Sequence, residues 1–265
     1  MSTNQEYPKA TRREFMRNTG MAVAAAALTT LHSRAQAADS QIKVGLVGCG
    51  GRGTGALRNA LLADESTVCY ALADVFEDQL EDSLKKMQKS EAANRVVVDK
   101  EHSFVGFDAY QKLIDCCDVV ILATPPAFRP KHLRAVVDAG KHCFCEKPVA
   151  VDGPGIRSVI ETVKLAKEKK LSLVSGLCYR YQHQKQETIK RIHEGAVGDI
   201  LTIETVYNTS ALWHKGRKDS WTEMEYQLRN WLYFDWLSAD HIVEQHIHSL
   251  DKMMWAMKDT PPAKA

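Results

Sequence analysis

Residues 41–53 of the chain are Gln41-Ile42-Lys43-Val44-Gly45-Leu46-Val47-Gly48-Cys49-Gly50-Gly51-Arg52-Gly53. The mostly apolar run over 42–47 is rich in β-branched residues and stops at a glycine, which predicts a buried parallel strand. Gly48, Gly50 and Gly53 have the spacing G-x-G-x-x-G, and residues 54–62 predict a helix. In this arrangement the first glycine permits a tight turn, the second lets a pyrophosphate approach the backbone, and the third lets the helix pack on the strand.

An acidic residue follows at the distance that such a site requires. Residues 68–73 predict a second strand that ends at Asp74, 21 residues beyond Gly53. A carboxylate there is expected to accept hydrogen bonds from a ribose, while the amides at the helix N-terminus hold the phosphates. The order of strand, glycines, helix, strand and acid therefore predicts a site for NAD, with NADP left open by the neighbouring Arg52. The alternative is a glycine-rich turn in an unrelated α/β domain.

The next residues continue the alternation of strands and helices. The expected strands are 95–98, 118–123, 142–145 and 171–174, and the expected helices are 76–89, 107–114, 129–139 and 155–169. This pattern predicts an α/β fold, with a doubly wound parallel sheet of the Rossmann type over residues 41–177.

Two short motifs follow successive predicted strands. Thr124-Pro125-Pro126 ends the strand over 118–123, and Glu146-Lys147-Pro148 ends the strand over 142–145. Open α/β sheets bind ligands at the carboxyl ends of their strands, so we expect these residues to line the cleft. The alternative for Lys147 is a surface lysine in a turn.

The pattern changes after residue 177. Residues 182–194 and 240–257 predict helices, and residues 200–207 alternate in the manner of a strand with one covered face. A tryptophan-rich stretch over 213–236 has no clear assignment. We therefore expect residues 178–265 to form an α+β domain with an open, mostly antiparallel sheet. Because one strand makes a poor domain, this domain is expected to be incomplete and the chain to be a truncated or unusually short form.

Composition limits the classes of protein. The chain has 265 residues, 45% hydrophobic and 26% charged, with a formal net charge of +2. The chain has no long basic run, which argues against a nucleic-acid partner. Beyond residue 40 no run approaches the 18 or so apolar residues of a membrane span.

The N-terminus has the layout of a bacterial export signal. Arg12-Arg13 precede Phe15, an alanine-rich apolar segment follows over 21–28, and Ala35-Gln36-Ala37 resembles a cleavage site. Paired arginines indicate the Tat route, so residues 1–37 are expected to be a signal peptide and the mature protein to be periplasmic or otherwise exported. The alternative is an arginine-rich amphipathic start on a cytoplasmic protein.

Seven cysteines raise the question of disulfides. The number is odd, Cys116 and Cys117 are adjacent, and the other five lie on or beside predicted buried strands: Cys49, Cys69, Cys143, Cys145 and Cys178. We interpret them as small core residues rather than as disulfides or metal ligands.

Taken together, these motifs resemble the Gfo/Idh/MocA family of oxidoreductases, which includes glucose–fructose oxidoreductase and inositol dehydrogenase. The matching stretches are 48–53, Ala73-Asp74-Val75, 123–126, Ala139-Gly140-Lys141-His142, Glu146-Lys147-Pro148 and 194–200. The resemblance extends over residues 41 to about 257.

The resemblance implies roles for particular residues. Lys147 would lie at the nicotinamide end and help to move a proton. The residues implied in cofactor binding are Gly48, Gly50, Gly51, Arg52, Gly53, Asp74, Thr124, Pro125, Pro126, Glu146, Lys147 and Arg180. The family's second domain commonly packs against another subunit, so a homo-oligomer formed through this sheet is also implied.

The second catalytic group is expected within residues 244–251. The family usually has D-x-G-x-H-x-x-D here, so Glu244 replaces the aspartate, His246 the glycine, and His248 is the implied acid/base. On a regular helix Glu244, His248 and Asp251 share a face, and a carboxylate one turn away would raise the pKa of the imidazole. The alternatives are surface histidines with ion-pair partners, or a metal site that includes His241; we expect no metal.

The resulting hypothesis is an NAD(P)-dependent oxidoreductase that transfers hydride between nicotinamide and a hydroxyl-bearing carbon of a sugar or polyol. One alternative is a glycoside hydrolase with tightly bound, recycled NAD. A second alternative is a non-catalytic protein that kept only the nucleotide fold.

Overall fold

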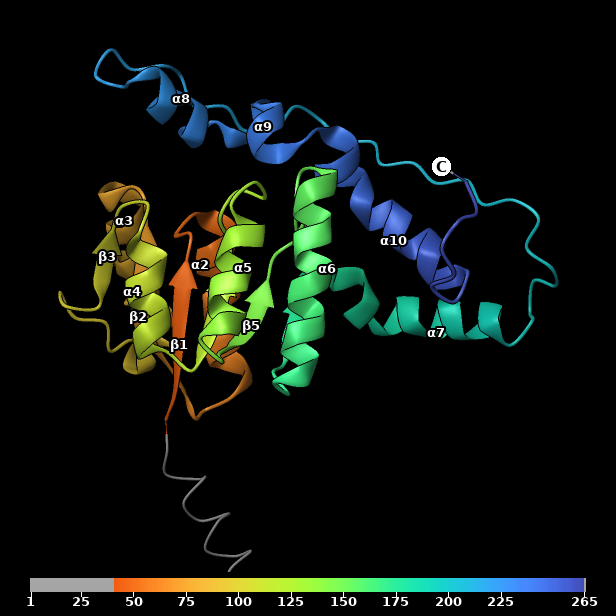
Figure 1. The fold of residues 1–265 in the computed structure, drawn as a ribbon, viewed down its shortest axis with the longest axis horizontal. Coiled ribbons are helices and arrows are strands. Elements are labelled where there is room, and N and C mark those ends of the chain that lie inside the picture. Colours follow the sequence, from red (N-terminus) through yellow and green to blue (C-terminus); the bar gives the residue numbers. More distant parts are fainter. Residues whose placement is uncertain (1–40, 265) are drawn as a thin grey trace, which may run out of the picture. The chain divides into compact units, whose positions relative to one another are not determined.

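The computed structural model describes residues 41–264 (Figure 1). The predicted signal peptide over 1–37 lies outside these residues. Among the described residues, no helix combines the length and apolar character that crossing a bilayer requires.

A six-stranded parallel sheet forms the centre of the structure. Its strands are β1 (Ile42–Val47), β2 (Thr67–Asp74), β3 (Ser103–Val105), β4 (Val119–Leu122), β5 (His142–Cys145) and β6 (Leu173–Ser175). Their order across the sheet is β3-β2-β1-β4-β5-β6, and every neighbouring pair is parallel. This is the order of the doubly wound dinucleotide-binding fold, so the predicted Rossmann sheet is confirmed.

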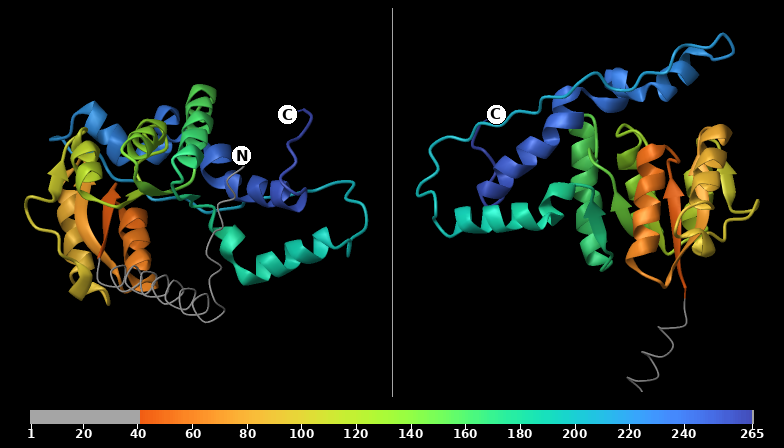
Figure 2. Two further views of the ribbon diagram at one scale, coloured as in Figure 1. Left: turned by 60° about the horizontal axis from the view of Figure 1, so that its bottom comes forward. Right: turned by 180° about the vertical axis from the view of Figure 1, so that it is seen from behind.

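Helices cover both faces of this sheet (Figure 2). Those that connect the strands are α2 (Gly51–Ala63), α3 (Glu77–Met87), α4 (Ala109–Cys116), α5 (Arg129–Asp138) and α6 (Gly153–Glu168). Successive residues of the strands point to opposite faces of the sheet and so contribute side chains to two hydrophobic cores. On one face Leu46 and Leu72 pack with α2 and α3, and on the other Val47 and Leu122 pack with α4 and α5. The central strands β1, β2 and β4 are therefore buried on both sides, as their nearly continuous apolar sequences require.

The third strand lies later in the chain than expected. Residues 95–98 were expected to form it, but Val96 makes only an isolated parallel bridge with Cys69. Arg95 closes a 3₁₀ turn, and Val97 remains 47% exposed, so this run lacks a continuous register with β2. Residues 103–105 pair with β2 instead, starting with Ser103 opposite Leu72.

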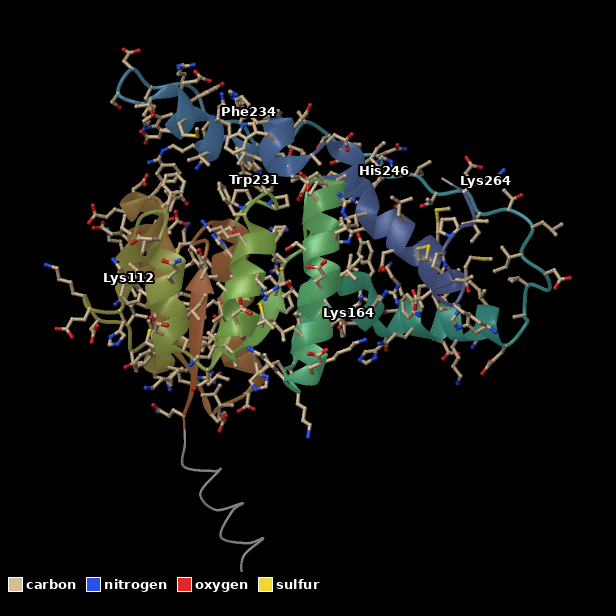
Figure 3. All side chains as sticks on the ribbon, in the orientation of Figure 1. Lys112, Lys164, Trp231, Phe234, His246 and Lys264 are labelled. Carbon is tan, nitrogen blue, oxygen red and sulfur yellow. The ribbon has the colours of Figure 1, made fainter. Side chains whose placement is uncertain are left out.

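The chain beyond β6 is helical or irregular. Its helices are α7 (His183–His193), α8 (Glu223–Arg229), α9 (Asp235–Ser238) and α10 (Ile247–Ala256), and a π-helical turn over Ile242–His246 precedes α10. Figure 1 shows the segment with α8 and α9 crossing the carboxyl ends of the strands. Trp231, Phe234 and His246, labelled in Figure 3, lie along this stretch.

The prediction of a strand over residues 200–207 is wrong for the described chain. These residues have no regular structure, and Leu201 is 92% exposed. No strand occurs anywhere in residues 178–264, so the run has no neighbour to which its backbone could donate and from which it could accept. The expected antiparallel sheet is therefore absent from this part of the chain.

The cysteines follow the predicted pattern with one exception. All seven are free thiols, and five of them are buried: Cys49, Cys69, Cys117, Cys143 and Cys145. Cys116 is half-buried, and Cys178 is exposed. Cys178 was expected beside a buried strand, but it begins a 3₁₀ turn after β6 has ended.

Candidate functional site

The glycines after β1 form a backbone cradle. Gly48 has a φ of +97°, and a Cβ on Gly53 would lie 2.0 Å from the carbonyl oxygen of Gly48. Gly50 caps α2 without a side-chain hydrogen bond, and the first turn of α2 contains no acidic residue. A Cβ on Gly50 or Gly51 would meet nothing within 4 Å, so no other part of the chain crowds the backbone on that side. This N-terminus fits the diphosphate of a dinucleotide.

Asp74 connects this cradle to β2. Its Oδ2 accepts a hydrogen bond from the amide of Cys49 at 2.7 Å, and its Oδ1 accepts one from the amide of Phe76 at 2.9 Å. Burial raises the pKa of Asp74, and the two amides oppose this rise. The carboxylate is thereby fixed at the edge of the pocket, with lone pairs left for the hydroxyls of a ribose.

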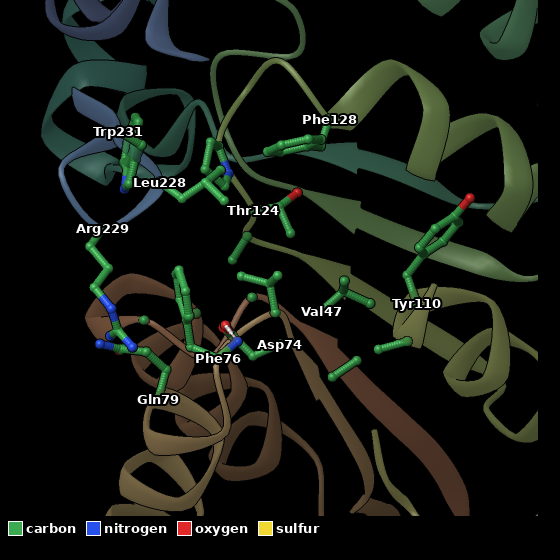
Figure 4. Close-up of a pocket in the computed structure, with 18 of the residues that line it drawn as sticks. Val47, Asp74, Phe76, Gln79, Tyr110, Thr124, Phe128, Leu228, Arg229 and Trp231 are labelled. Atoms are coloured by element: carbon green, nitrogen blue, oxygen red, sulfur yellow. Dashed lines mark hydrogen bonds between the residues drawn. The ribbon is translucent and has the colours of Figure 1, made fainter. Parts of the chain in front are cut away.

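A pocket of about 610 Å³ lies at the carboxyl ends of β1, β2 and β4 (Figure 4). The cradle and Asp74 form its floor, and Thr124, Pro125 and Phe128 form one side. Its far wall comes from the tryptophan-rich stretch. The residues contributed by that stretch are Trp213, Lys215, Leu228, Arg229 and Trp231. Pro126 is not part of the lining, and neither are the expected Glu146, Lys147 and Pro148.

Arg52 and Glu146 link the glycine cradle to the end of β5. The guanidinium Nε of Arg52 donates to Oε1 of Glu146 at 2.6 Å, and the carboxylate is buried. A Cβ on Gly176 would lie 2.5 Å from Oε2 of Glu146, so only a glycine fits beside this carboxylate. Glu146 thus engages Nε of Arg52, while the Arg52 side chain stays 55% exposed and lines the pocket.

Lys147 and Glu244 form a buried ion pair beyond this link. Nζ of Lys147 donates to Oε1 of Glu244 at 2.7 Å and to its carbonyl oxygen at 2.6 Å. The two side chains are 15% and 9% exposed. Oε2 of Glu244 is buried without a hydrogen-bond partner among the described residues. Burial raises the pKa of Glu244, and Lys147 opposes the rise.

His248 lies near this pair without a polar partner of its own. Its Nδ1 is buried and has no hydrogen-bond partner among residues 41–264. The ring lies 4.9 Å from that of Tyr179 and 6.2 Å from that of Tyr207, between ring centroids. Burial lowers the pKa of His248, and the charge of Lys147 lowers it further. The imidazole is therefore neutral near pH 7 and able to accept a proton.

The expected effect of Glu244 on His248 is wrong. The carboxylate was expected to orient the imidazole and raise its pKa, but it binds Lys147, and the pKa of His248 is lowered. The physical reason is the π-helical turn over Ile242–His246, which changes the phase between Glu244 and His248. Asp251 accepts from Nε of Arg180 at 2.9 Å, and its charge only partly opposes the lowering of the His248 pKa.

Arg180 has a different environment from the one implied. Besides Asp251, its guanidinium binds Asp259 at 2.6 and 3.1 Å. It does not line the pocket, so in this structure it joins the 3₁₀ turn after β6 to α10 and the residues that follow. Cofactor binding by Arg180 stays a prediction.

Other charged residues of the site were not identified from the sequence. Arg129 is 3% exposed, its Nη1 donates to the carbonyl oxygen of Pro148, and its Nε is buried without a partner among the described residues. His132 lines the pocket, and burial lowers its pKa to about 4, with Lys131 and Arg129 contributing. Neither position carries a local signal, because both lie on a helix with ordinary spacing. Within residues 41–264 no three His, Cys, Asp or Glu side chains are placed to hold a metal ion, and the group around His241 and His246 is no exception.

Comparisons with known proteins agree with the fold. A family model described as "Oxidoreductase family, NAD-binding Rossmann fold", GFO_IDH_MocA, matches residues 42–177. The aldose-aldose oxidoreductase from Caulobacter crescentus has a similar fold, with a TM-score of 0.61 at 19% identity, covering 82% of this chain and 58% of that one.

Three curated relatives have names that describe different activities. The 2,7-anhydro-N-acetylneuraminate hydratase of Escherichia coli is 30% identical over 57% of this chain and 35% of its own length. Glycosyl hydrolase family 109 protein 2 of Shewanella sp. (strain ANA-3) is 26% identical over 65% and 36%. The NADP(+)-dependent scyllo-inositol 2-dehydrogenase of Bacillus subtilis is 29% identical over 68% and 49%. The chain thus spans between about a third and a half of these relatives.

Proposed function

Since the chain belongs to the GFO_IDH_MocA oxidoreductase family, whose Rossmann fold binds NAD, we propose that it is an NAD(P)-dependent oxidoreductase acting on a sugar or polyol. The observation that carries this proposal is the buried pair of Lys147 and Glu244 at the carboxyl end of β5, next to an imidazole that is free to accept a proton. The inositol dehydrogenase among the relatives supports a polyol as substrate.

The residues of the chain have separate tasks in this reaction. When bound, the nicotinamide supplies the acceptor for the hydride that leaves the substrate carbon. The amides at the start of α2 hold the diphosphate, and Asp74 holds a ribose. His248 accepts the hydroxyl proton at a ring nitrogen. Lys147, which is paired with Glu244, donates a hydrogen bond to the substrate oxygen and stabilises negative charge that develops there.

A second candidate function is a glycoside hydrolase that uses tightly bound, recycled NAD. The glycosyl hydrolase family 109 relative favours this candidate. The two functions share the first step, which is removal of a hydride from a sugar carbon, so they require the same residues. They differ in the net reaction, because the hydrolase returns the hydride and accumulates no reduced cofactor.

The test begins with the nucleotide itself. We expect the purified protein to carry NAD or to bind it in a calorimetric titration, and a panel of sugars and polyols to reveal steady formation of NADH. Release of an aglycone without net NADH would instead favour the hydrolase. A protein that neither carries nor binds any nicotinamide dinucleotide would overturn both.

Export by the Tat route is a further part of the proposal. The paired Arg12-Arg13 and the apolar segment after them support it. We expect the full chain fused to a reporter to reach the periplasm, and Arg12→Lys combined with Arg13→Lys to keep it in the cytoplasm. We further propose residues 41–177 as the cofactor domain, and residues 178–265 as part of a domain for substrate binding and self-association.

A further inference from the structure

The far wall of the pocket has no assigned role. We call residues 213–237 the strap, because this segment crosses the pocket from α3 to the loop between β4 and α5. Trp213, Lys215 and Trp231 from the strap line the pocket opposite the glycine cradle and Asp74. In Figure 4 Leu228, Arg229 and Trp231 lie across the opening from Thr124 and Phe128.

One end of the strap is attached to α3 through Arg229. Its Nη1 and Nη2 each donate to a carboxylate oxygen of Asp78 at 3.0 Å, and its Nε donates to Glu225 at 2.9 Å. The guanidinium also lies 3.9 Å from the ring centroid of Phe76. The Arg229 side chain is only 9% exposed. A partly desolvated, bidentate pair of this kind is stronger than an ordinary surface ion pair.

The other end is attached beside α5. The amide of Ala127 donates to the carbonyl oxygen of Leu237 at 3.2 Å. The ring of Phe128 meets that of Trp236 edge to face, with centroids 6.5 Å apart. The strap is therefore held on both sides of the pocket.

The part of the strap around Lys215 is also hydrogen-bonded to the part around Asn230. Asn230 is fully buried, its Oδ1 accepts from the amide of Lys215 at 2.7 Å, and its Nδ2 donates to the carbonyl oxygen of Lys215 at 3.1 Å. This holds the backbone of Lys215 in place, and its ammonium makes no ion pair within the described chain. The strap is fixed in place, and the Lys215 ammonium lines the pocket, where it can bind a phosphate on the adenosine half of a dinucleotide.

We propose that the strap binds the adenosine half of the dinucleotide against α3, and that Arg229 keeps it closed and so sets the rate of dinucleotide release. The inference rests on the proposed function, because it takes the dinucleotide as the ligand of the pocket. Arg229 acts here as a positioning residue. With the strap attached at both ends, the ligand leaves only when one attachment opens.

The test measures release from the full chain. Protein loaded with NADH is mixed with excess NAD, and the loss of bound-NADH fluorescence gives the dissociation rate. We expect Arg229→Met and Asp78→Asn to release NADH about tenfold faster, the effect of losing one charge-assisted attachment. Raising the salt concentration should speed release more in the wild type than in Asp78→Asn, which has already lost the salt-sensitive attachment.

Arg217→Met is the matched control. Arg217 lies in the same strap and pairs with Glu223 at 2.6 Å, but it neither lines the pocket nor touches α3. The rate of NADH release from Arg217→Met should equal that of the wild type. Asp78 is 64% exposed, so Asp78→Asn keeps the test valid if Arg229→Met does not fold.

Two results would overturn the inference. Equal release rates in the wild type and both variants would show that the strap does not hold the ligand, while the proposed function would stand. Absence of NADH binding by the wild type in an equilibrium titration would remove the proposed function as well.

Discussion

At the scale of single residues, the ion pair between Lys147 and Glu244 has the largest consequences. Removing one partner leaves the other charge buried, at a cost of about 3 kcal/mol of folding stability. We predict that Lys147→Met lowers kcat about a hundredfold or more, because the substrate oxygen loses its cationic donor. The dissociation constant for NAD should change little, and calorimetry checks this.

A double variant separates stability from catalysis. Lys147→Met with Glu244→Gln leaves no unpaired charge, so urea unfolding should recover part of the lost stability without recovering kcat. Wild-type turnover in Lys147→Met would contradict the assigned role. Equal stability of the single and double variants would contradict the ion pair.

His132 provides a prediction for pH dependence. Its folded-state pKa is about 4, against 6.5 for a free histidine, mainly because it is buried. Between these pH values the unfolded chain binds a proton that the folded chain does not, so stability falls as the pH falls from 6.5 to 4. The expected contribution is of order 3 kcal/mol.

The measurement is urea unfolding of the wild type and His132→Gln at several pH values. The variant loses the ring stacked on Tyr110, which changes its stability by an amount that does not depend on pH, so only the slopes are compared. The stability of His132→Gln should depend less steeply on pH over this interval. Parallel curves for the two proteins would show that His132 does not titrate as the structure implies.

At the scale of elements, the contact between β1 and α2 depends on Gly53. A Cβ at this position would meet the carbonyl oxygen of Gly48 at 2.0 Å and the Cβ of Ala123 at 3.0 Å, and neither can move far. We predict that Gly53→Ala destabilises the fold by about 3 kcal/mol or more. Chemical unfolding gives the value.

The same helix contains its control. A Cβ on Gly55 would lie no closer than 3.8 Å to its nearest neighbour, the flexible Arg52, so Gly55→Ala should stabilise α2 by roughly 0.5–1 kcal/mol. If Gly53→Ala unfolds within about 1 kcal/mol of the wild type, the close approach of helix and strand is not essential.

Elements with a local signal could be predicted from the sequence, and those defined by distant partners could not. The strand, glycines and helix over residues 42–63 carry their information within one stretch, and the strand before Glu146 and Lys147 was likewise predicted with its observed bounds. Glu244 was expected to serve His248, because a regular helix was assumed. Its actual partner is 97 residues away and depends on a π-helical turn that no sequence period indicates.

At the scale of the whole molecule, dependence on distant partners also explains why the strap could not be predicted from the sequence. Its tryptophans have no helical or strand period, and its position depends on Arg229 reaching Asp78 across 151 residues of sequence. The expected strand over 200–207 failed for a related reason. A strand needs a partner, and none exists in residues 178–264.

The irregular stretch between α7 and the strap should be the first site of proteolysis. Residues 199–212 contain no helix or strand, and Leu201 is 92% exposed. We predict that brief digestion with chymotrypsin cuts here first and leaves an N-terminal fragment with all six strands, as mass spectrometry of the products would show. A first cut within residues 42–177 would contradict the boundary.

The exposed Cys178 allows a dye to be attached close to His248, one of the proposed catalytic residues. Five of the other thiols are buried and the sixth, Cys116, is half-buried, so a maleimide dye added at low excess should modify Cys178 first. The next residue, Tyr179, contacts the ring of His248. A single dye at this point would report on sugar binding through its emission, without any mutation of the protein.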